Sequence, residues 1–307
     1  MSSQPPARVA VLPASAPSWM AEAVVAGGGQ VVDLEDAEAL VWADASAADG
    51  LEQVLHDAPR LRWIQLPFAG VEPLIHLVDD DRLWTCGKGV YAEPVAEMAL
   101  TLGLAGLRGL ATYAKATRWG DQAGVNLVGG RVTIVGGGGI AESLLRLLAP
   151  FKAHITVVRN RPDAMDGADD VYGTEHLDRA APGADLVILA LALTPDTVGI
   201  MGADQFALME PHACLVNVAR GPHVVTDELV EALRDGEIGS AGLDVTDPEP
   251  LPDGHPLWSL PNCIITPHVG NTREMAAPLL TARIVENVQR WIDDRPLIGR
   301  IDPDLGY

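Results

Sequence analysis

The stretch that decides the fold is Val132-Thr133-Ile134-Val135-Gly136-Gly137-Gly138-Gly139-Ile140-Ala141. Its four β-branched residues predict a buried strand, its glycines predict a tight turn, and the apolar pattern from Glu142 to Leu148 predicts a helix. The glycines match the pattern G-x-G-x-x-G/A, in which Gly136 makes the turn, Gly138 leaves room for a pyrophosphate and Ala141 packs the helix on the strand. Because the helix N-terminus also attracts phosphate, the sequence predicts a dinucleotide-binding domain.

The end of the next predicted strand, Ile155–Val158, indicates which dinucleotide binds. An acidic residue there accepts the ribose hydroxyl of NAD, whereas an arginine accommodates the 2′-phosphate of NADP. This strand runs into Arg159-Asn160-Arg161, so we expect NADP as the preferred cofactor, with NAD possible. The alternative is that the two arginines are solvated and neutralise the acidic residues that follow, Asp163, Asp166, Asp169 and Asp170.

Composition excludes several classes of function. The chain has 307 residues, a length typical of about two domains. Its net charge of −21 repels phosphate backbones and anionic lipids, so we expect neither nucleic acid nor membrane among its partners. Cys86, Cys214 and Cys263 are too widely spaced for a disulfide framework or a metal site. We therefore expect a cytoplasmic protein that holds no metal.

The rest of the chain alternates short apolar runs with stretches of helical spacing. The runs predict further strands at Val9–Leu12, Val31–Leu34, Leu40–Ala43, Trp63–Leu66, Leu83–Cys86, Ile155–Val158, Asp185–Leu191, Cys214–Val218, Gly242–Val245 and Ile264–Thr266. Helices are predicted at Trp19–Val25, Ala47–Asp57, Glu93–Arg118, Thr226–Arg234 and Arg273–Ile292. Thr226 is the candidate N-cap of its helix, and Gly236 its candidate stop. This alternation predicts an α/β fold with parallel sheets.

Reactive side chains follow three of these strands. Arg220 comes just after Cys214–Val218, Asp244 lies near the end of the next strand, and His268 follows the last one. Ligands of open α/β sheets bind outside the carboxyl ends of the strands. The sequence therefore predicts that an arginine, a carboxylate and a histidine converge on the dinucleotide site.

These segments resemble the D-isomer-specific 2-hydroxyacid dehydrogenase family, in particular its short, glyoxylate/hydroxypyruvate reductase-like members. The similar segments are Asn217-Val218-Ala219-Arg220-Gly221, Gly242-Leu243-Asp244-Val245, Asp247-Pro248-Glu249-Pro250-Leu251 and Thr266-Pro267-His268. The resemblance is dense from about Val90 to Arg273 and thin over the first sixty residues. It implies a reversible hydride transfer between a nicotinamide cofactor and a small 2-oxo or D-2-hydroxy acid, with glyoxylate and hydroxypyruvate as first candidates.

The resemblance also implies the roles of the catalytic residues, Arg220, Glu249 and His268. Arg220 binds the substrate carboxylate and carbonyl oxygen, because its rigid fork matches a carboxylate and stays charged. His268 gives the proton in reduction and takes it in oxidation, while Glu249 orients the imidazole and favours its protonated form. Asp244 orients the nicotinamide carboxamide. The substrate is held by Ala69, Gly70, Arg220 and His268, the first two through backbone N–H groups.

We expect the cofactor to contact one set of residues around the strand ends. This set comprises Gly136, Gly138, Gly139, Ile140, Arg159, Asn160, Arg161, Leu191, Pro195, Val218, Ala219, Arg220, Asp244, His268 and Gly270. Lys88 and Arg118 receive no role.

The resemblance implies two Rossmann-like, doubly wound parallel-sheet domains. The flavodoxin-like substrate domain is discontinuous, 1–96 and 274–307, and the NAD(P)-binding domain spans 97–273. We expect hinge closure over the active site and a homodimer with contacts around Arg118–Val128. One alternative function is a dinucleotide-sensing, co-repressor-like protein of the same fold, which would bind a partner without turnover. A related amino-acid dehydrogenase is a second alternative, and it would show ammonia-dependent turnover.

Overall fold

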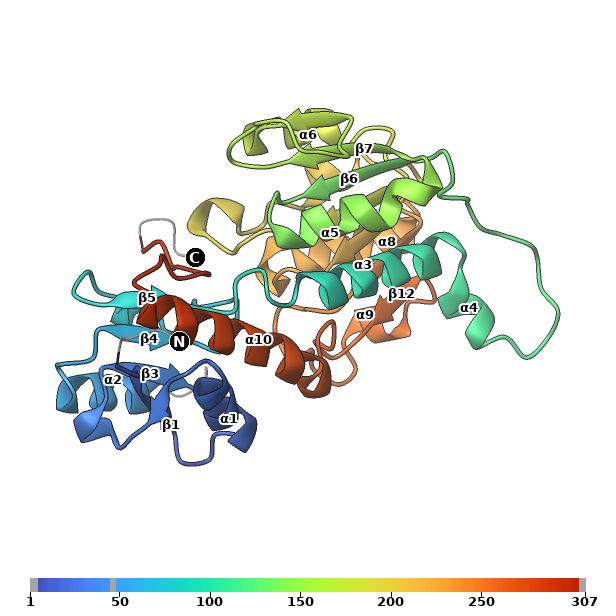
Figure 1. The fold of residues 1–307 in the computed structure, drawn as a ribbon. Helices are drawn as coiled ribbons and strands as arrows, with labels where there is room; N and C mark the ends of the chain where they lie inside the picture. Colours follow the sequence, from blue (N-terminus) through green and yellow to red (C-terminus); the bar gives the residue numbers. More distant parts are fainter. Residues whose placement is uncertain (1–4, 45–47, 304–307) are drawn as a thin grey trace. The chain divides into compact units, whose positions relative to one another are not determined.

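The computed structural model of the protein describes residues 5–44 and 48–303. Internal contacts divide the chain into a first unit, Met1–Tyr91 with Thr272–Tyr307, and a second unit, Ala92–Asn271 (Figure 1). The chain thus passes between the units slightly before positions 96/97 and 273/274, where the sequence placed the boundaries. At the first crossing the reason is helix α3 (Ala92–Leu107), which packs on strands of the second unit.

The first unit contains a five-stranded parallel sheet in the order β2-β1-β3-β4-β5. Its strands are β1 (Arg8–Leu12), β2 (Gln30–Val31), β3 (Ala39–Trp42), β4 (Trp63–Gln65) and β5 (Leu83–Thr85). Its helices are α1 (Ser18–Ala26), α2 (Ala48–Asp57) and α10 (Arg273–Ile292), with short 3-10 turns η1 (Leu34–Asp36) and η2 (Ile75–Leu77). Residue 47, expected to begin the second helix, lies outside the described residues.

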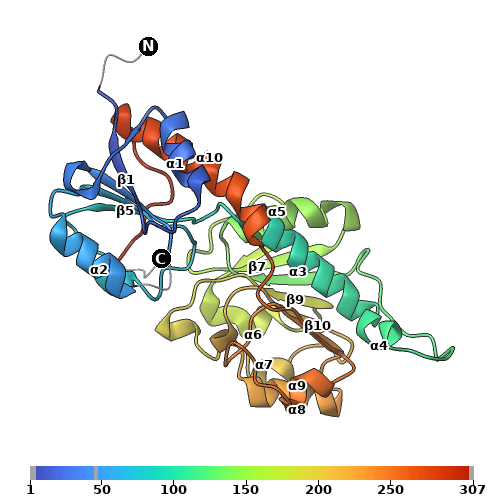
Figure 2. The same cartoon turned by 90° about the horizontal axis from the view of Figure 1, so that it is seen from below.

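Helices cover both faces of this sheet. Val9, Val41 and Trp63 pack on one face against α1 and α10, which lie side by side in Figure 2. Leu40 and Ile64 pack on the other face against α2. Successive strand residues point to opposite faces, so a sheet covered on both sides needs apolar residues throughout its strands. This is why the strands read as continuous apolar runs.

The second unit contains a seven-stranded parallel sheet in the order β12-β11-β10-β9-β6-β7-β8. Its strands are β6 (Arg131–Val135), β7 (His154–Val158), β8 (Asp170–Tyr172), β9 (Leu186–Leu189), β10 (Cys214–Asn217), β11 (Ser240–Leu243) and β12 (Cys263–Ile265). Its helices are α3, α4 (Leu110–Ala114), α5 (Gly139–Leu148), α6 (Leu177–Ala180), α7 (Ala203–Phe206), α8 (Thr226–Asp235) and α9 (Pro256–Ser259). Its 3-10 turns are η3 (Ala149–Phe151), η4 (Thr174–His176), η5 (Pro195–Thr197) and η6 (Gly221–His223). Two parallel sheets with helices on their faces confirm the predicted fold class.

The register of this sheet places the strand ends level with one another. Val135 of β6 pairs with Leu189 of β9, which pairs with Asn217 of β10. Asn217 pairs in turn with Leu243 of β11, and Leu243 with Ile265 of β12. The segments that follow these residues therefore emerge at a single edge. After β6 the chain adds β7 on one side and later β9 on the other, so the glycine loop lies at the switch point where such sheets bind ligands.

The helix predicted over Glu93–Arg118 is wrong in its extent. α3 ends at Leu107, and Gly109 follows with φ +63°, a left-handed conformation that glycine adopts without steric cost. The short α4 comes next, and Arg118 lies beyond it in a segment without helix or strand. Alanine and leucine continue past the glycine, which is why the sequence pattern did not reveal the break.

Two smaller predictions are also corrected, and one strand was missed. The strand expected at Val31–Leu34 is only Gln30–Val31, and Leu34 begins a 3-10 turn. β8, which pairs with β7 at the sheet edge, was not predicted. The N-cap of α8 is Val225 rather than Thr226, whose hydroxyl instead donates to the carbonyl of Asp247 at 2.9 Å. Gly236 does end this helix in the left-handed conformation.

Candidate active site

A histidine and a glutamate meet beyond the last strands of the second unit. Nδ1 of His268 lies 2.7 Å from Oε1 of Glu249, and both side chains are about half exposed. His268 has φ +53°, a left-handed conformation that costs a non-glycine residue roughly 1 kcal/mol or more. Its backbone N–H donates to the carbonyl of Asp244 at 2.9 Å. The loop thus holds His268 in a strained backbone conformation, with Nδ1 of the ring on a carboxylate and Nε2 making no hydrogen bond to any of the described residues.

Asp244 organises the loop that carries His268. Its carboxylate is buried and accepts hydrogen bonds from the Thr266 hydroxyl at 2.5 Å and from the N–H groups of Val269 and Gly270 at 2.9 and 2.8 Å. A buried carboxylate needs such donors to replace water. Asp244 therefore fixes the backbone on both sides of His268. Its expected contact with the nicotinamide carboxamide stays a prediction.

Arg220 is placed by the end of β10. The Asn217 side chain donates to the Arg220 carbonyl at 2.9 Å and accepts from the N–H of Ala219 at 3.0 Å. The Arg220 guanidinium itself donates to the Ala219 carbonyl at 2.7 Å. A Cβ on Gly221 would lie 1.9 Å from the carbonyl oxygen of Thr246, so only glycine allows this loop to approach the segment leading to Glu249.

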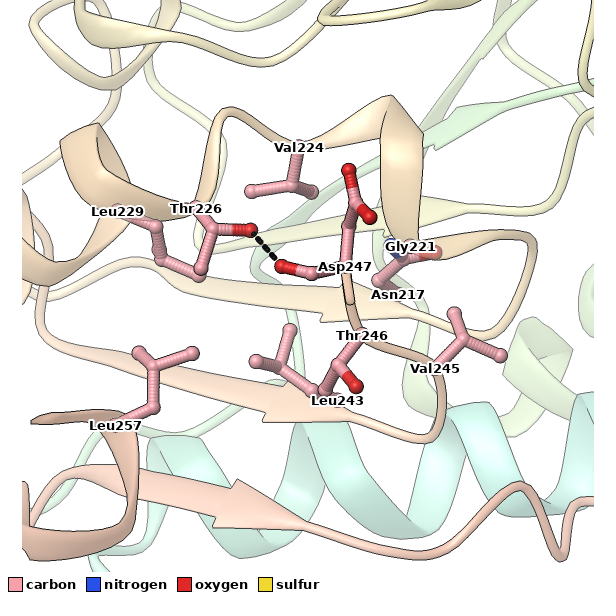
Figure 3. Close-up of a pocket in the computed structure, with 10 residues that line it drawn as sticks. All are labelled: Asn217, Gly221, Val224, Thr226, Leu229, Leu243, Val245, Thr246, Asp247 and Leu257. Carbon is pink, nitrogen blue, oxygen red and sulfur yellow. Dashed lines mark hydrogen bonds between the residues drawn. The ribbon is translucent and has the colours of Figure 1, made fainter. Parts of the chain in front are cut away.

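A small pocket lies between these two segments, and Figure 3 shows its lining residues. The hydrogen bond from Thr226 to Asp247 closes one side, and Leu229, Leu243 and Leu257 close the apolar side. Its volume of about 10 Å³ leaves room for at most one water molecule. The pocket is therefore a packing feature of the loops beside Arg220 and not a substrate cavity.

The glycine loop after β6 has the shape that a pyrophosphate requires. Gly136 has φ +122°, and a Cβ there would lie 2.2 Å from the carbonyl oxygen of Ala190 at the end of β9. Around Gly138, by contrast, a Cβ would meet nothing within 4 Å. Gly138 is the N-cap of α5, whose first residues are Gly139 and Ile140. Open space beside a ten-residue helix N-terminus fits the phosphates of a dinucleotide.

Arg159 lies against the glycine loop. A Cβ on Gly137 would lie 2.7 Å from Cδ and Nε of Arg159, so the arginine side chain crosses this glycine. Its backbone is fixed by a hydrogen bond to the Tyr172 carbonyl of β8 at 3.0 Å. Among the described residues, neither Arg159 nor Arg161 lies within 4.0 Å of a carboxylate. The structure therefore does not show the neutralising role that was the alternative for these arginines.

Other residues expected near the cofactor lie at the same edge of the sheet. Leu191 and Pro195 follow β9, and Val218 and Ala219 follow β10, with the Val218 N–H donating to the Leu189 carbonyl at 3.3 Å. Asn160 accepts from the Thr174 hydroxyl at 2.9 Å. Within the described part of the chain, no three His, Cys, Asp or Glu side chains are grouped as metal ligands.

The loop after β4 carries Ala69 and Gly70 in the first unit. Three groups fix the carbonyl oxygens of residues 67–69. The Tyr91 hydroxyl donates to that of Pro67 at 2.5 Å, and the Gly87 N–H donates to that of Phe68 at 2.8 Å. The Cys86 thiol donates to that of Ala69 at 3.9 Å. Burial raises the pKa of Tyr91, so its hydroxyl stays a donor. No carbonyl in the described residues accepts from the N–H groups of Ala69 and Gly70, which is the arrangement an anion site needs.

Sequence reasoning missed several residues that build the site. Asn217, Thr266 and Tyr91 brace the loops of Arg220, His268 and Gly70. The first two stand inside the motifs quoted above, so their position was visible but their partners were not. For Tyr91 the sequence carries no comparable signal.

Three comparisons with known proteins bear on this site. Residues 98–270 match the sequence model described as "D-isomer specific 2-hydroxyacid dehydrogenase, NAD binding domain". The chain is 36% identical over 93% of its length to an uncharacterized protein from Corynebacterium melassecola, of which it covers 95%. It is 35% identical to the glyoxylate reductase/hydroxypyruvate reductase of Mus musculus, but over only 60% of this chain and 58% of that protein.

A solved structure extends the likeness to the whole chain. It is the D-isomer specific 2-hydroxyacid dehydrogenase from Xanthobacter autotrophicus Py2, crystallised with NADPH and MES. The two structures superpose with a TM-score of 0.84 at 27% identity, over 99% of this chain and 100% of that one.

Proposed function

Because the chain belongs to the D-isomer specific 2-hydroxyacid dehydrogenase family, we propose that it reduces a small 2-oxo acid to the D-2-hydroxy acid, with NADPH preferred and NADH possible. Membership makes the protein an oxidoreductase that acts on the CH–OH group of its donors with a nicotinamide cofactor. The observation that carries the proposal is the 2.7 Å contact between His268 and Glu249, at the strand edge that also presents Arg220.

The chemistry needs a proton donor and a cation. The glycine loop around Gly136 and Gly138 would hold a nicotinamide cofactor, which would supply the hydride for the carbonyl carbon. His268 gives its Nε2 proton to the carbonyl oxygen as negative charge develops there, and in oxidation it takes the proton back. Glu249, on Nδ1, keeps the ring oriented and compensates its positive charge. Arg220 binds the substrate carboxylate through its two parallel N–H groups.

The preference for NADPH is supported by Arg159. Its side chain crosses Gly137 beside the helix N-terminus that the phosphates would occupy, and it has no carboxylate partner among the described residues. A guanidinium at this place matches a ribose 2′-phosphate better than a hydroxyl. The Xanthobacter structure, which contains NADPH, supports the same assignment.

Glyoxylate and hydroxypyruvate are the proposed substrates. The name of the mouse relative supports both. The backbone N–H groups of Ala69 and Gly70 suit the carboxylate of a small acid, because a carboxylate accepts hydrogen bonds from N–H donors. The proposal also includes a cytoplasmic location, which fits three free, buried cysteines.

We propose that the protein acts as a homodimer. The support is a pair of exposed apolar side chains in the segment that follows α4, Trp119 at 92% and Val128 at 66% exposure. A tryptophan exposed to this degree is typical of a surface that a partner covers. Light scattering of the wild type and of Trp119→Ser measures the state: the wild type is expected at twice the chain mass and the variant at a lower mass.

The proposed reaction is tested by initial rates with NADPH and with NADH across a panel of 2-oxo acids. The expected result is turnover of glyoxylate or hydroxypyruvate, with higher catalytic efficiency for NADPH. Higher efficiency with NADH would contradict the role of Arg159 and leave the reaction standing. Binding of either cofactor without turnover of any 2-oxo acid would contradict the reaction itself.

A further inference from the structure

The imidazole of His223 is fully buried in the second unit, three positions after Arg220, and the proposed reaction does not use it. Its Nδ1 lies 3.1 Å from the carbonyl oxygen of Thr197, and its Nε2 lies 3.3 Å from that of Leu191. Both carbonyls belong to the segment that follows β9. One side chain therefore spans the two ends of a segment in which cofactor contacts are expected.

The backbone alone does not fix this segment. Hydrogen bonds join Gly199 to Pro222 at 2.8 Å and Met201 to His223 at 3.0 Å, but they lie beyond residue 197. A neutral imidazole donates to one of the two carbonyls, and a protonated one to both. Among the described residues, the ring is the polar side chain that joins residues 191–197 to the loop of Arg220, through one hydrogen bond when it is neutral and two when it is protonated.

The two ends of the segment are supported unequally. Thr197 is also held by its own hydroxyl, which donates to the Ala192 carbonyl at 3.0 Å and accepts from the Thr194 N–H at 2.8 Å. For the Leu191 carbonyl, the described residues show only the His223 ring as a donor. The link from Nε2 to Leu191 is therefore the more consequential of the two.

We propose that His223 is a positioning residue for dinucleotide binding, which holds the Leu191–Thr197 segment in place relative to Arg220. It contacts neither substrate nor cofactor itself and acts through Leu191 and Pro195. This inference rests on the proposed function for the assignment of those two residues. It goes beyond that function by giving a task to a buried histidine of the Arg220 loop.

Three substitutions separate the two hydrogen bonds. The amide nitrogen of His223→Gln reaches about the position of Nε2 and keeps the donor to Leu191. That of His223→Asn reaches about the position of Nδ1 and keeps the donor to Thr197. His223→Leu removes both donors with little change in volume.

The measurement is the dissociation constant of NADPH by fluorescence titration. Because a buried carbonyl left without its donor loses a full hydrogen bond, His223→Leu and His223→Asn are expected to bind NADPH about tenfold more weakly. His223→Gln is expected to stay within about threefold of the wild type, since the decisive donor is kept.

A matched control is available in the same unit. The Asn262 side chain also donates to two carbonyls, those of Leu233 and Gly239, each at 3.2 Å. These carbonyls precede β11, so they do not lie at the carboxyl ends of the strands, where the cofactor is expected. Asn262→Leu should lower the melting temperature without changing the NADPH dissociation constant. A merely structural role of His223 would make the two Leu variants behave alike.

Equal NADPH affinity in the wild type and all three His223 variants would overturn the proposal, as would equal weakening in Asn262→Leu. If His223→Leu does not fold, the NADPH affinities of His223→Gln and His223→Asn decide the question, and equal affinities of these two variants would overturn the proposal. Binding requires no turnover, so a wild type that binds NADPH and reduces no 2-oxo acid contradicts the proposed reaction and still permits this test.

Discussion

Nδ1 of His268 lies 2.7 Å from Oε1 of Glu249, although nineteen positions separate the two residues in the chain. The glutamate follows β11 and the histidine follows β12, so the pair exists because parallel neighbours end at the same edge. The carboxylate fixes the ring from one side, and Asp244 fixes the backbone beneath it. We therefore expect the other ring nitrogen, Nε2, to be the one that transfers the proton.

Replacing Glu249 by Gln should lower kcat about tenfold or more, because the ring loses the charge that holds it in its productive orientation. The KM of NADPH should not change. Steady-state kinetics of the variant measure both. The exposed Glu237→Gln in the same unit is the control and should behave as the wild type. An unchanged kcat in Glu249→Gln would show that the pair is not used.

Arg220→Lys should raise the KM of the 2-oxo acid and lower kcat/KM about a hundredfold, because an ammonium keeps the charge but not the planar fork that binds a carboxylate. Saturation curves at fixed NADPH measure this change. The brace from Asn217 to the backbone of residue 220 does not depend on the side chain, so the melting temperature should stay close to that of the wild type.

Arg159→Gln should raise the KM of NADPH about tenfold, since a hydrogen bond between two charged groups is lost, and leave that of NADH nearly unchanged. The ratio of the two kcat/KM values is the readout. Arg179→Gln, an exposed arginine of the same unit, supplies the control. Equal effects on the two cofactors would contradict the assignment of Arg159 to the 2′-phosphate.

A fourth prediction concerns the stability of the first unit. Partial burial opposes ionisation of Glu38, but hydrogen bonds from Arg62, from the N–H of Arg8 and from Trp291 outweigh it and hold its pKa below the ordinary 4.5. A lowered folded pKa adds stability above about pH 4.5, and this stability disappears as the pH falls through the folded value.

Glu38→Gln should therefore cost about 1 kcal/mol of unfolding free energy at pH 7, and this cost should become smaller as the pH falls below 4.5 towards 3. Urea unfolding followed by tryptophan fluorescence measures this free energy. The fluorescence reports on the region of Glu38, because Trp291 donates to its carboxylate and the ring centroids of Trp291 and Trp63 lie 5.7 Å apart. A difference between the two proteins that is the same at both pH values would contradict the electrostatic account.

Much of the fold could be predicted from the sequence, because the patterns that indicate helices and strands lie within short stretches of the chain. The strand, glycine loop and helix at Val132–Leu148 and the last helix, Arg273–Ile292, could be predicted from their own residues. The end of α3 could not be predicted, because the helix-favouring composition continues past Gly109 and only the structure shows the left-handed turn there. β8 was too short to stand out as a strand.

Individual contacts are harder to predict from the sequence than helices and strands are. The motifs named Asp244 and Arg220, but the hydrogen bonds of Asp244 to the His268 loop depend on how β11 and β12 are aligned. The approach of Gly221 to Thr246 depends on two loops that are distant in the chain. Tertiary packing decides such contacts, and residue spacing does not encode it.

The central claim is that His268 donates the proton in 2-oxo acid reduction, and His268→Gln tests it most directly. Stopped-flow measurement of NADPH oxidation should show a rate about a thousandfold below that of the wild type, because a positioned general acid contributes on this order. The NADPH dissociation constant, measured on the same samples, should stay within about threefold of the wild type, since the glycine loop is untouched. An oxidation rate close to that of the wild type would contradict the claim.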